Sequence, residues 1–204
     1  MNIPALDQAK RDLGDGAWVA LLDDFVPGDV SIMETLRATL PLKQESIRLA
    51  GKDVRTPRLV SWHGDPDARY AYSGRTFEPA AWTPDLLAVK QRVDATVGAS
   101  FNSVLVNYYR DGNDSMGEHA DNEPELGPAR DNVLIASISL GARRRFLLRH
   151  KQSGTVEPFE LGDGSLLVMG GTTQRYWKHR VPRTAAEVGP RMNLTFRVVV
   201  MCHT

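Results

Sequence analysis

Cysteine, long apolar runs and net charge are all scarce in this sequence, and each scarcity excludes a class of protein. The 204 residues include one cysteine, Cys202, so an intrachain disulfide framework is excluded and a reducing compartment is expected. No stretch approaches the roughly 18 consecutive apolar residues of a membrane-spanning helix. The segment Met1–Pro4 lacks the basic and apolar regions of a secretory signal. We therefore expect a soluble cytoplasmic protein, or a nuclear one in a eukaryote.

Charge is balanced overall but unevenly distributed along the chain. The 25 basic and 25 acidic residues cancel, so no global charge indicates nucleic acid or membrane binding. Two stretches, 143–151 and 175–183, nevertheless contain several basic residues and no acidic one. Either these are solvated strand ends, or they form a local cationic face that contacts phosphates. The sequence leaves both interpretations open.

Hydrophobic periodicity divides the chain into two halves. One strand and two helices are expected in the first half, at residues 19–25, 29–40 and 83–97. Thr83 and Pro84 suit the N-cap and first position of the later helix, and Gly98 suits its C-cap. The second half has five apolar runs separated by glycine-containing turns, at residues 101–109, 133–140, 146–149, 166–169 and 194–201.

Short strands with glycine-rich turns are typical of a β-sandwich or barrel. We predict an α+β, mainly β fold: a double-stranded β-helix, or jelly roll, that can hold a site at its open mouth. The chain is expected to be a single domain, 1–204. Residues 1–100 would form an N-terminal helical buttress and a lid, and residues 101–204 a jelly-roll catalytic core.

Two histidines and one aspartate are the candidate metal ligands. His119 and Asp121 are two residues apart, so an extended segment directs both side chains to the same side. With His179 they could cover one face of an octahedral Fe(II) ion and leave three positions for a bidentate co-substrate and oxygen. A His-x-Asp pair alone is common, and the other three histidines are interpreted as structural or surface residues.

Arg191 and Arg197 are candidate carboxylate-binding residues. A guanidinium can hold a carboxylate through two parallel hydrogen bonds, so either side chain could clamp a dicarboxylic co-substrate. Arg197 interrupts the apolar run 194–200, and an inward-facing charge there is costly unless it is paired. A surface role remains the alternative for Arg191.

Several motifs occur together in a recognisable order. They are Asn107-Tyr108-Tyr109-Arg110-Asp111-Gly112, His119-Ala120-Asp121-Asn122-Glu123, His179, and Pro190-Arg191-Met192-Asn193-Leu194-Thr195-Phe196-Arg197. In order and spacing they resemble the AlkB family of iron(II)- and 2-oxoglutarate-dependent dioxygenases, which oxidatively dealkylate nucleic-acid bases. The resemblance covers about residues 57–201. Within the family, the sequence is most similar to the repair-type homologues that act on 1-methyladenine and 3-methylcytosine.

The resemblance implies a role for each matching residue. It implies that Fe(II) is held by His119, Asp121 and His179. It implies that 2-oxoglutarate is surrounded by Asn107, Tyr109, Arg191, Asn193 and Arg197. It also implies that the lid recognises the nucleotide.

The target base has its own candidate residues. Tyr70 and Tyr72 are two apart and could stack a nucleobase, although core packing is an equal interpretation. Trp62 falls where a further pocket aromatic is expected. Glu123 matches the acidic residue near the base edge, where it could accept a hydrogen bond from an exocyclic amine. The candidate phosphate contacts are Arg58, Arg149, Lys151 and Lys178.

An enzyme that acts on a base inside a duplex must first extrude that base from the stack. Ala50, in the stretch 47–52, stands near the position at which duplex-active relatives carry a large aromatic wedge. Single-stranded DNA or RNA is therefore the favoured substrate, and we expect a monomer. Two alternatives remain: an oxygenase of the same chemistry that acts on protein or a small molecule, and a non-catalytic nucleic-acid-binding jelly roll.

Overall fold

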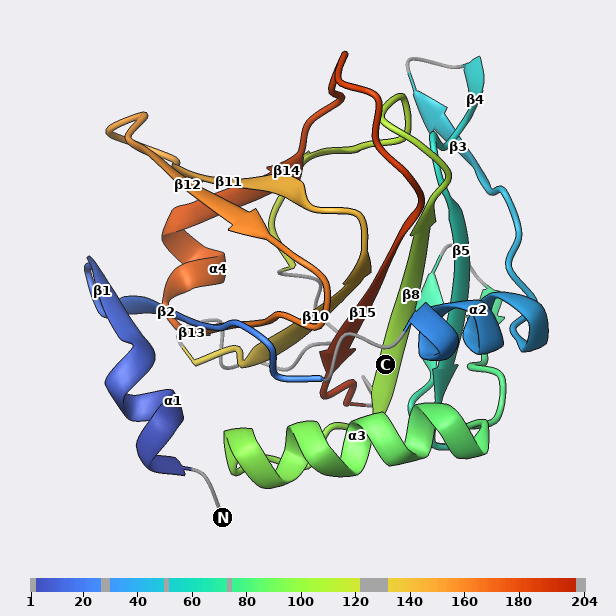
Figure 1. Cartoon of the computed structure of the whole chain (residues 1–204), viewed down its shortest axis with the longest axis horizontal. Helices are drawn as coiled ribbons and strands as arrows, with labels where there is room; N and C mark the ends of the chain where they lie inside the picture. The colour runs from blue at the N-terminus through green and yellow to red at the C-terminus, as the bar shows by residue number, and fades with distance from the viewer. Residues whose placement is uncertain (1–2, 27–29, 50–51, 73–74, 122–131, 201–204) are drawn as a thin grey trace.

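Two antiparallel sheets face each other in the computed structural model, which describes residues 3–26, 30–49, 52–72, 75–121 and 132–200 (Figure 1). The seven-stranded sheet has the order β1 (Lys10–Gly14), β2 (Ala17–Leu22), β13 (Leu166–Gly171), β10 (Ile135–Gly141), β15 (Arg191–Arg197), β8 (Ser103–Tyr109) and β5 (Leu59–Gly64). The four-stranded sheet has the order β12 (Val156–Leu161), β11 (Arg144–His150), β14 (Trp177–Val181) and β9 (Met116–His119). This architecture confirms the predicted mainly β jelly roll.

Alternation along the strands gives the large sheet two different faces. One face packs against α1 (Ile3–Ala9), α2 (Val30–Thr39) and α3 (Pro84–Val97), through residues such as Leu36 and Leu86 (Figure 1). The opposite face packs against the four-stranded sheet, where Ile135 meets Phe146 and Leu148 in a second apolar cluster. Polar side chains that share this second face therefore point between the sheets.

Local capping explains the most regular helix. The Thr83 hydroxyl accepts a hydrogen bond from the Leu86 amide at 3.3 Å, and Pro84 occupies the first helical position. Gly98 ends α3 with a φ angle of 72°, a left-handed conformation that glycine adopts without strain. The predicted boundaries of this helix are confirmed.

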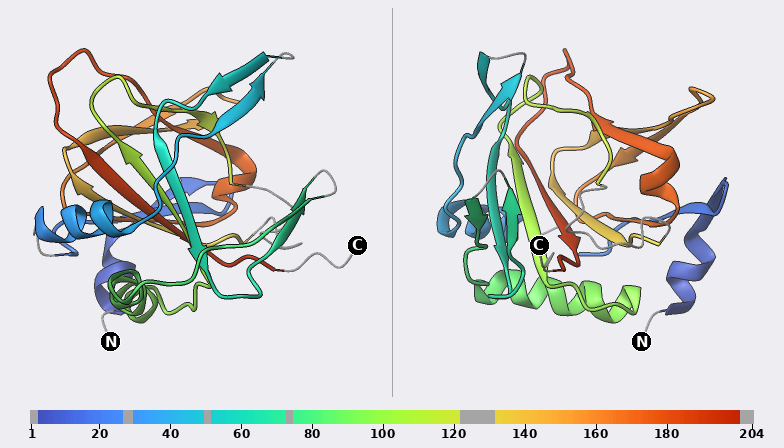
Figure 2. Two further views of the ribbon diagram at one scale, coloured as in Figure 1. Left: turned by 90° about the vertical axis from the view of Figure 1, so that its right-hand side faces the viewer. Right: turned by 180° about the vertical axis from the view of Figure 1, so that it is seen from behind.

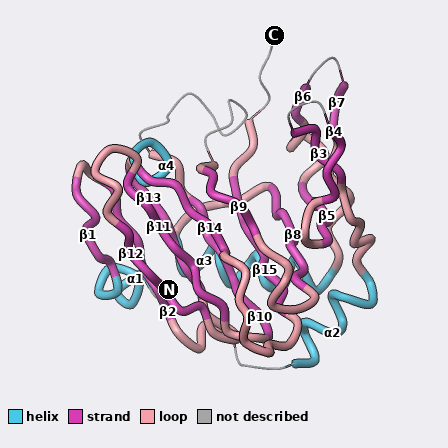
Figure 3. Tube along the Cα trace, turned by 90° about the horizontal axis from the view of Figure 1, so that it is seen from above, coloured by secondary structure: helices cyan, strands magenta, loops and turns pink. Residues whose placement is uncertain are grey.

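Two hairpins project from the β5 side of the large sheet (Figures 2 and 3). One consists of β3 (Ser46–Leu49) and β4 (Lys52–Arg55), and the other of β6 (Tyr70–Tyr72) and β7 (Arg75–Phe77). They precede and follow β5 in sequence. Residues 50–51 and 73–74 lie outside the described residues, so the prediction based on Ala50 has no structural counterpart.

The structure changes some predicted elements. The last strand is β15, Arg191–Arg197, instead of residues 194–201, and this shift brings Arg191 into the sheet. The division of the chain at residue 100 remains a proposal. Strands β1, β2 and β5 come from the first hundred residues and are hydrogen-bonded into the large sheet. Within the part of the chain that is described, no helix has the length and apolar character needed to cross a membrane.

Candidate functional site

A cavity lies between the two sheets, and it contains all the predicted metal ligands. About 440 Å³ of space in the cavity and its open mouth is free of protein atoms. Its polar lining consists of Asn107, Tyr109, His119, Asp121, Ser137, His179, Arg191, Asn193, Thr195 and Arg197. Its apolar lining consists of Met116, Phe146, Met169 and Val181. The sequence therefore brings its separate motifs to one place.

The two histidines come together through strand pairing. His119 ends β9 and is the register partner of His179 on β14, with ring centroids 4.2 Å apart. Asp121 follows two residues later, and one potential ligand atom from each of the three side chains lies within 4.8 Å of the others. The His119 Nδ1 donates to the Gly117 carbonyl at 2.8 Å, which fixes the ring and leaves Nε2 as the acceptor atom.

Burial and charge set the protonation of this cluster. Desolvation by burial lowers the pKa of His179 to about 3, so its imidazole is neutral at physiological pH. Burial raises the pKa of Asp121, but the positive charge of the Arg197 guanidinium, with smaller contributions from His179 and His119, outweighs that effect and lowers it overall. A neutral imidazole beside an ionised carboxylate is the protonation state that metal coordination requires.

Asp121 is held from two sides. Its backbone amide donates to the Gln174 Oε1 at 2.9 Å, and its Oδ1 accepts a hydrogen bond from the Arg197 guanidinium. Its Oδ2 lies 3.6 Å from the His179 Nε2 and has no hydrogen-bond partner among the described residues. A buried carboxylate oxygen without a donor is costly, and a bound cation would compensate it.

Arg191 is a buried cation on the opposite wall. It is 1% exposed, and its Nη2 donates to the Ser139 hydroxyl at 2.7 Å. Its guanidinium carbon lies 5.2 Å from the centroid of the Tyr109 ring. Within the described residues its Nε and Nη1 have no hydrogen-bond partner. A buried guanidinium with two open donors fits a carboxylate ligand.

Two asparagines line the cavity in register, since Asn193 on β15 pairs with Asn107 on β8. The Asn193 amide nitrogen donates to the Ser137 hydroxyl at 2.7 Å and to the Ile138 carbonyl at 2.9 Å. Both ends of its carboxamide are engaged, because its Oδ1 also accepts from the Thr195 hydroxyl. Asn107 differs, because only its Oδ1 takes part in a described hydrogen bond, which it accepts from Arg58.

Comparison with known proteins gives this geometry a context. Residues 26–197 match the model of the 2OG-Fe(II) oxygenase superfamily, which is most of the chain. The chain belongs to the 2OG-Fe(II) oxygenase superfamily.

Individual relatives extend the match. DNA oxidative demethylase ALKBH2 of Mus musculus is 41% identical over 162 residues, which are 76% of this chain and 66% of that protein. Alpha-ketoglutarate-dependent dioxygenase alkB homolog 3 of Homo sapiens is 40% identical over 178 residues, 82% of this chain and 60% of that protein. The matched region thus spans less than two thirds of the length of these relatives.

A solved structure, described as the structure of OsALKBH1, supports the fold. It superposes with a TM-score of 0.64 at 20% identity, and the match covers 92% of this chain and 100% of that one. The predicted resemblance to the AlkB family is confirmed by these relatives. Fe(II) and 2-oxoglutarate are the cofactor and co-substrate of the superfamily, as predicted.

The residues present fit both groups. Two imidazoles and one carboxylate form a donor set suited to Fe(II) in non-haem oxygenases, and Asp121 offers an oxygen that lacks a donor among the described residues. Arg191 offers two open donors to a carboxylate. His119, Asp121 and His179 would hold the metal, and Arg191 would bind the distal carboxylate of the co-substrate.

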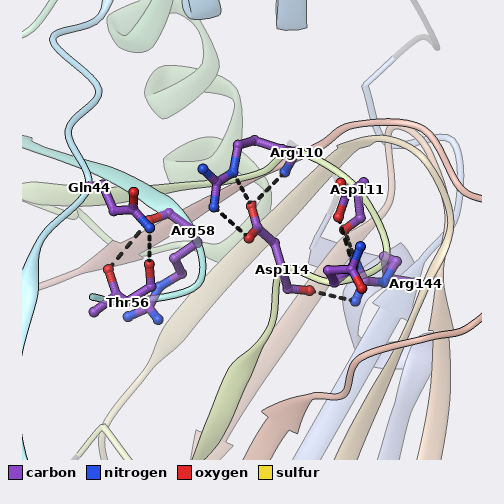
Figure 4. A network of polar contacts seen from close by, with 8 residues as sticks. Gln44, Thr56, Arg58, Arg110, Asp111, Asp114 and Arg144 are labelled. Atoms are coloured by element: carbon purple, nitrogen blue, oxygen red, sulfur yellow. Dashed lines mark hydrogen bonds and ion pairs between the residues drawn. The ribbon is translucent and has the colours of Figure 1, made fainter. Parts of the chain in front are cut away.

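Sequence reasoning missed two residues of this oxygenase that support the site. Gln174 contacts the Asp121 backbone, and Arg144 is 3% exposed although it belongs to a run of three arginines. Arg144 donates to the carbonyls of Asp111 and Asp114 (Figure 4) and to that of Pro182. Its guanidinium carbon lies 5.8 Å from the centroid of the Tyr109 ring. Strand alternation in β11, where Phe146 and Leu148 are buried, is the signal that could have indicated it.

The candidate base and phosphate residues are distributed differently. Tyr70 and Tyr72 are the first and last residues of β6, and Glu123 lies outside the described residues. Trp62 on β5 does not appear among the residues that line the described cavity. The Lys151 ammonium donates to the carbonyls of Gln174 and Arg175, so it closes the end of helix α4 (Thr173–Tyr176).

Two of the basic candidates remain at the surface of the four-stranded sheet. Arg149 and Lys178 are exposed register partners on β11 and β14. Arg149 lies 3.5 Å from Glu118, which neutralises part of its charge. Lys178 therefore remains a candidate phosphate contact, and Arg149 is a weaker one.

Proposed function

We propose that this chain oxidatively demethylates N-alkylated nucleobases such as 1-methyladenine and 3-methylcytosine, and so takes part in the repair of alkylated DNA. The reaction would consume 2-oxoglutarate and dioxygen and release succinate, carbon dioxide, formaldehyde and the unmodified base. The observation that carries this proposal is that one cavity is lined both by Arg191 and by the His119, Asp121 and His179 cluster. Relatives named as DNA oxidative demethylases, at about 40% identity, support the nucleobase as target.

Each side chain has a role in this proposal. Bound Fe(II), with 2-oxoglutarate and dioxygen, supplies the oxidising chemistry, and the protein supplies binding, orientation and exclusion of water. His119, Asp121 and His179 hold the metal. Arg191 fixes the distal carboxylate of 2-oxoglutarate, Arg197 holds Asp121 in place, and Tyr109 packs against Arg191. Asn107 and Asn193 complete the wall.

The substrate is proposed to be single-stranded DNA or RNA, bound by a monomer. Tyr70, Tyr72, Trp62 and Glu123 are the proposed base contacts. The small Ala50 in the 47–52 stretch supports the single-stranded preference, since flipping a base from a duplex costs a few kcal/mol that a small side chain compensates poorly.

An assay on matched oligonucleotides tests the proposal. The iron-loaded protein is incubated with 2-oxoglutarate and oligonucleotides that contain 1-methyladenine or 3-methylcytosine, in single- and double-stranded DNA and in RNA. We expect formaldehyde and unmodified base, with the fastest turnover on single strands. Succinate without either product would contradict the nucleobase target and favour a protein or small-molecule substrate. Equal background activity in wild type and His119→Ala would favour the non-catalytic alternative.

A further inference from the structure

Arg58 connects the β3–β4 hairpin with the wall of the cavity. It lies directly before β5, in which Leu59 and Val60 are register partners of Tyr108 and Asn107 on β8. Its Nε donates to the Asn107 Oδ1 at 2.8 Å, and Asn107 is 3% exposed. Arg58 is half-buried, so part of its guanidinium is removed from water to make this contact.

The backbone that carries Arg58 is anchored on both sides. Thr56, which is 3% exposed, exchanges hydrogen bonds with the hairpin base, where its amide donates to the Glu45 carbonyl at 2.8 Å. Gln44 donates to the Thr56 carbonyl at 2.9 Å, as Figure 4 shows beside Arg58. The Pro57 carbonyl accepts from the Ser115 amide at 2.9 Å, which joins the segment to the loop before β9. Arg58 therefore extends from a fixed backbone.

The contact selects one orientation of the Asn107 carboxamide. An arginine Nε can only donate, so the oxygen of Asn107 must face Arg58. The amide nitrogen is then the end left for the cavity, where it can donate to an anionic ligand. The reverse orientation would oppose two donors and would leave the carboxamide oxygen facing that ligand, which is unfavourable for a carboxylate.

We propose that Arg58 is a positioning residue for 2-oxoglutarate, which it affects by holding Asn107 in the orientation that donates to the co-substrate. This inference rests on the proposed function, because it requires 2-oxoglutarate to occupy the cavity. It differs from the interpretation of Arg58 as a phosphate contact. A phosphate contact affects oligonucleotide binding alone, whereas a positioning residue affects co-substrate binding in the absence of any nucleic acid.

The test measures 2-oxoglutarate binding by calorimetry to the Mn(II)-loaded protein, in which turnover is excluded, without oligonucleotide. We expect Arg58→Ala to weaken binding about tenfold, equivalent to one lost charge-assisted hydrogen bond. Arg58→Lys should weaken it similarly, since lysine has a carbon in place of the Nε donor while its charge can still contact a phosphate. In an Asn107→Ala background, Arg58→Ala should have no further effect, because both residues act through one contact.

Arg55→Ala is the matched control, since Arg55 is an exposed arginine three residues earlier, on β4. It should leave 2-oxoglutarate affinity unchanged. Unchanged affinity in Arg58→Ala, or additive losses in the double variant, would overturn the inference. Weaker oligonucleotide binding with normal 2-oxoglutarate binding would assign Arg58 to the phosphates instead. If the wild type itself bound no 2-oxoglutarate in the presence of metal, the proposed function would fail first.

Discussion

His119 and His179 are register partners across the antiparallel strands β9 and β14, and their rings lie 4.2 Å apart at the edge of the cavity. Backbone pairing thus places the two imidazoles before any metal binds. The third potential ligand, Asp121, comes after β9 has ended and depends on side-chain contacts to Gln174 and Arg197 for its position. The histidines are held by the sheet and the aspartate by its neighbours, so the two kinds of ligand should respond differently to substitution.

Asp121→Asn should remove metal binding while the fold is retained. The amide has nearly the shape of the carboxylate but lacks the negative charge that coordination requires. We expect Mn(II) affinity, measured by calorimetry, to fall by more than about 100-fold, beyond the usual effect of residues that only contact a ligand. Glu118→Gln, on strand β9 just before Asp121, is the control and should bind Mn(II) normally. Normal affinity in Asp121→Asn would refute the metal assignment.

Gln174→Met should weaken metal binding by a smaller factor. Methionine fills a similar volume but cannot accept the hydrogen bond from the Asp121 amide, and Gln174 is 1% exposed. Loss of such a supporting contact typically lowers metal affinity by about 10- to 100-fold. The same calorimetric titration measures it, with Gln152→Met in an exposed turn as the control. Equal affinities in the two variants would show that Asp121 needs no support from Gln174.

Local sequence signals predicted the regular elements well and the short ones poorly. Helix α3 was predictable because its caps, Thr83 and Gly98, act within one turn of the backbone they satisfy. Strand β12 contains Pro158, and β14 has exposed basic residues at alternate positions, so neither reads as an apolar run. Their strand conformation comes from pairing with β11, a non-local interaction that the local pattern does not encode.

The candidate site shows the same limit. The cavity gathers the predicted metal and co-substrate residues, whose motifs indicated them, although their roles remain predictions. The partner predicted for Arg197 was a carboxylate of the co-substrate, whereas within the chain its guanidinium contacts Asp121, which the apolar run did not indicate. Gln174 was missed because a buried amide that contacts a distant backbone has no signature in sequence.

Arg191→Met should separate stability from co-substrate binding. Taking a charge out of water is costly, and replacing buried charged groups by apolar side chains of similar volume often stabilises a protein, by about 1 to 4 kcal/mol for ion pairs. The variant without ligand should therefore melt at a higher temperature than wild type. Added 2-oxoglutarate with Mn(II) should raise the melting temperature of wild type and leave that of the variant unchanged. Arg145→Met, at an exposed site on β11, should respond to ligand as wild type does.

Asp114 should make the loop before β9 sensitive to acid. Burial raises the pKa of its carboxyl, but the hydrogen bonds from the Arg110 side chain and backbone, at 2.8 and 2.9 Å, outweigh burial and lower the pKa overall (Figure 4). A carboxyl whose folded pKa lies below its unfolded value of about 3.9 stabilises the fold above that value. This contribution is lost as the pH falls through the lowered folded pKa.

Asp114→Asn removes that pH dependence and tests its sign. At pH 7 the variant should be less stable than wild type by about 2 to 3 kcal/mol, the scale of hydrogen bonds to a charged group. Urea unfolding at a series of pH values should show this difference shrinking as the pH falls below about 4, because protonated Asp114 resembles asparagine. Asp111→Asn, an exposed neighbour, should lose little at any pH. A difference that stays constant down to acid pH would mean that Asp114 stabilises the loop through shape alone, without its charge.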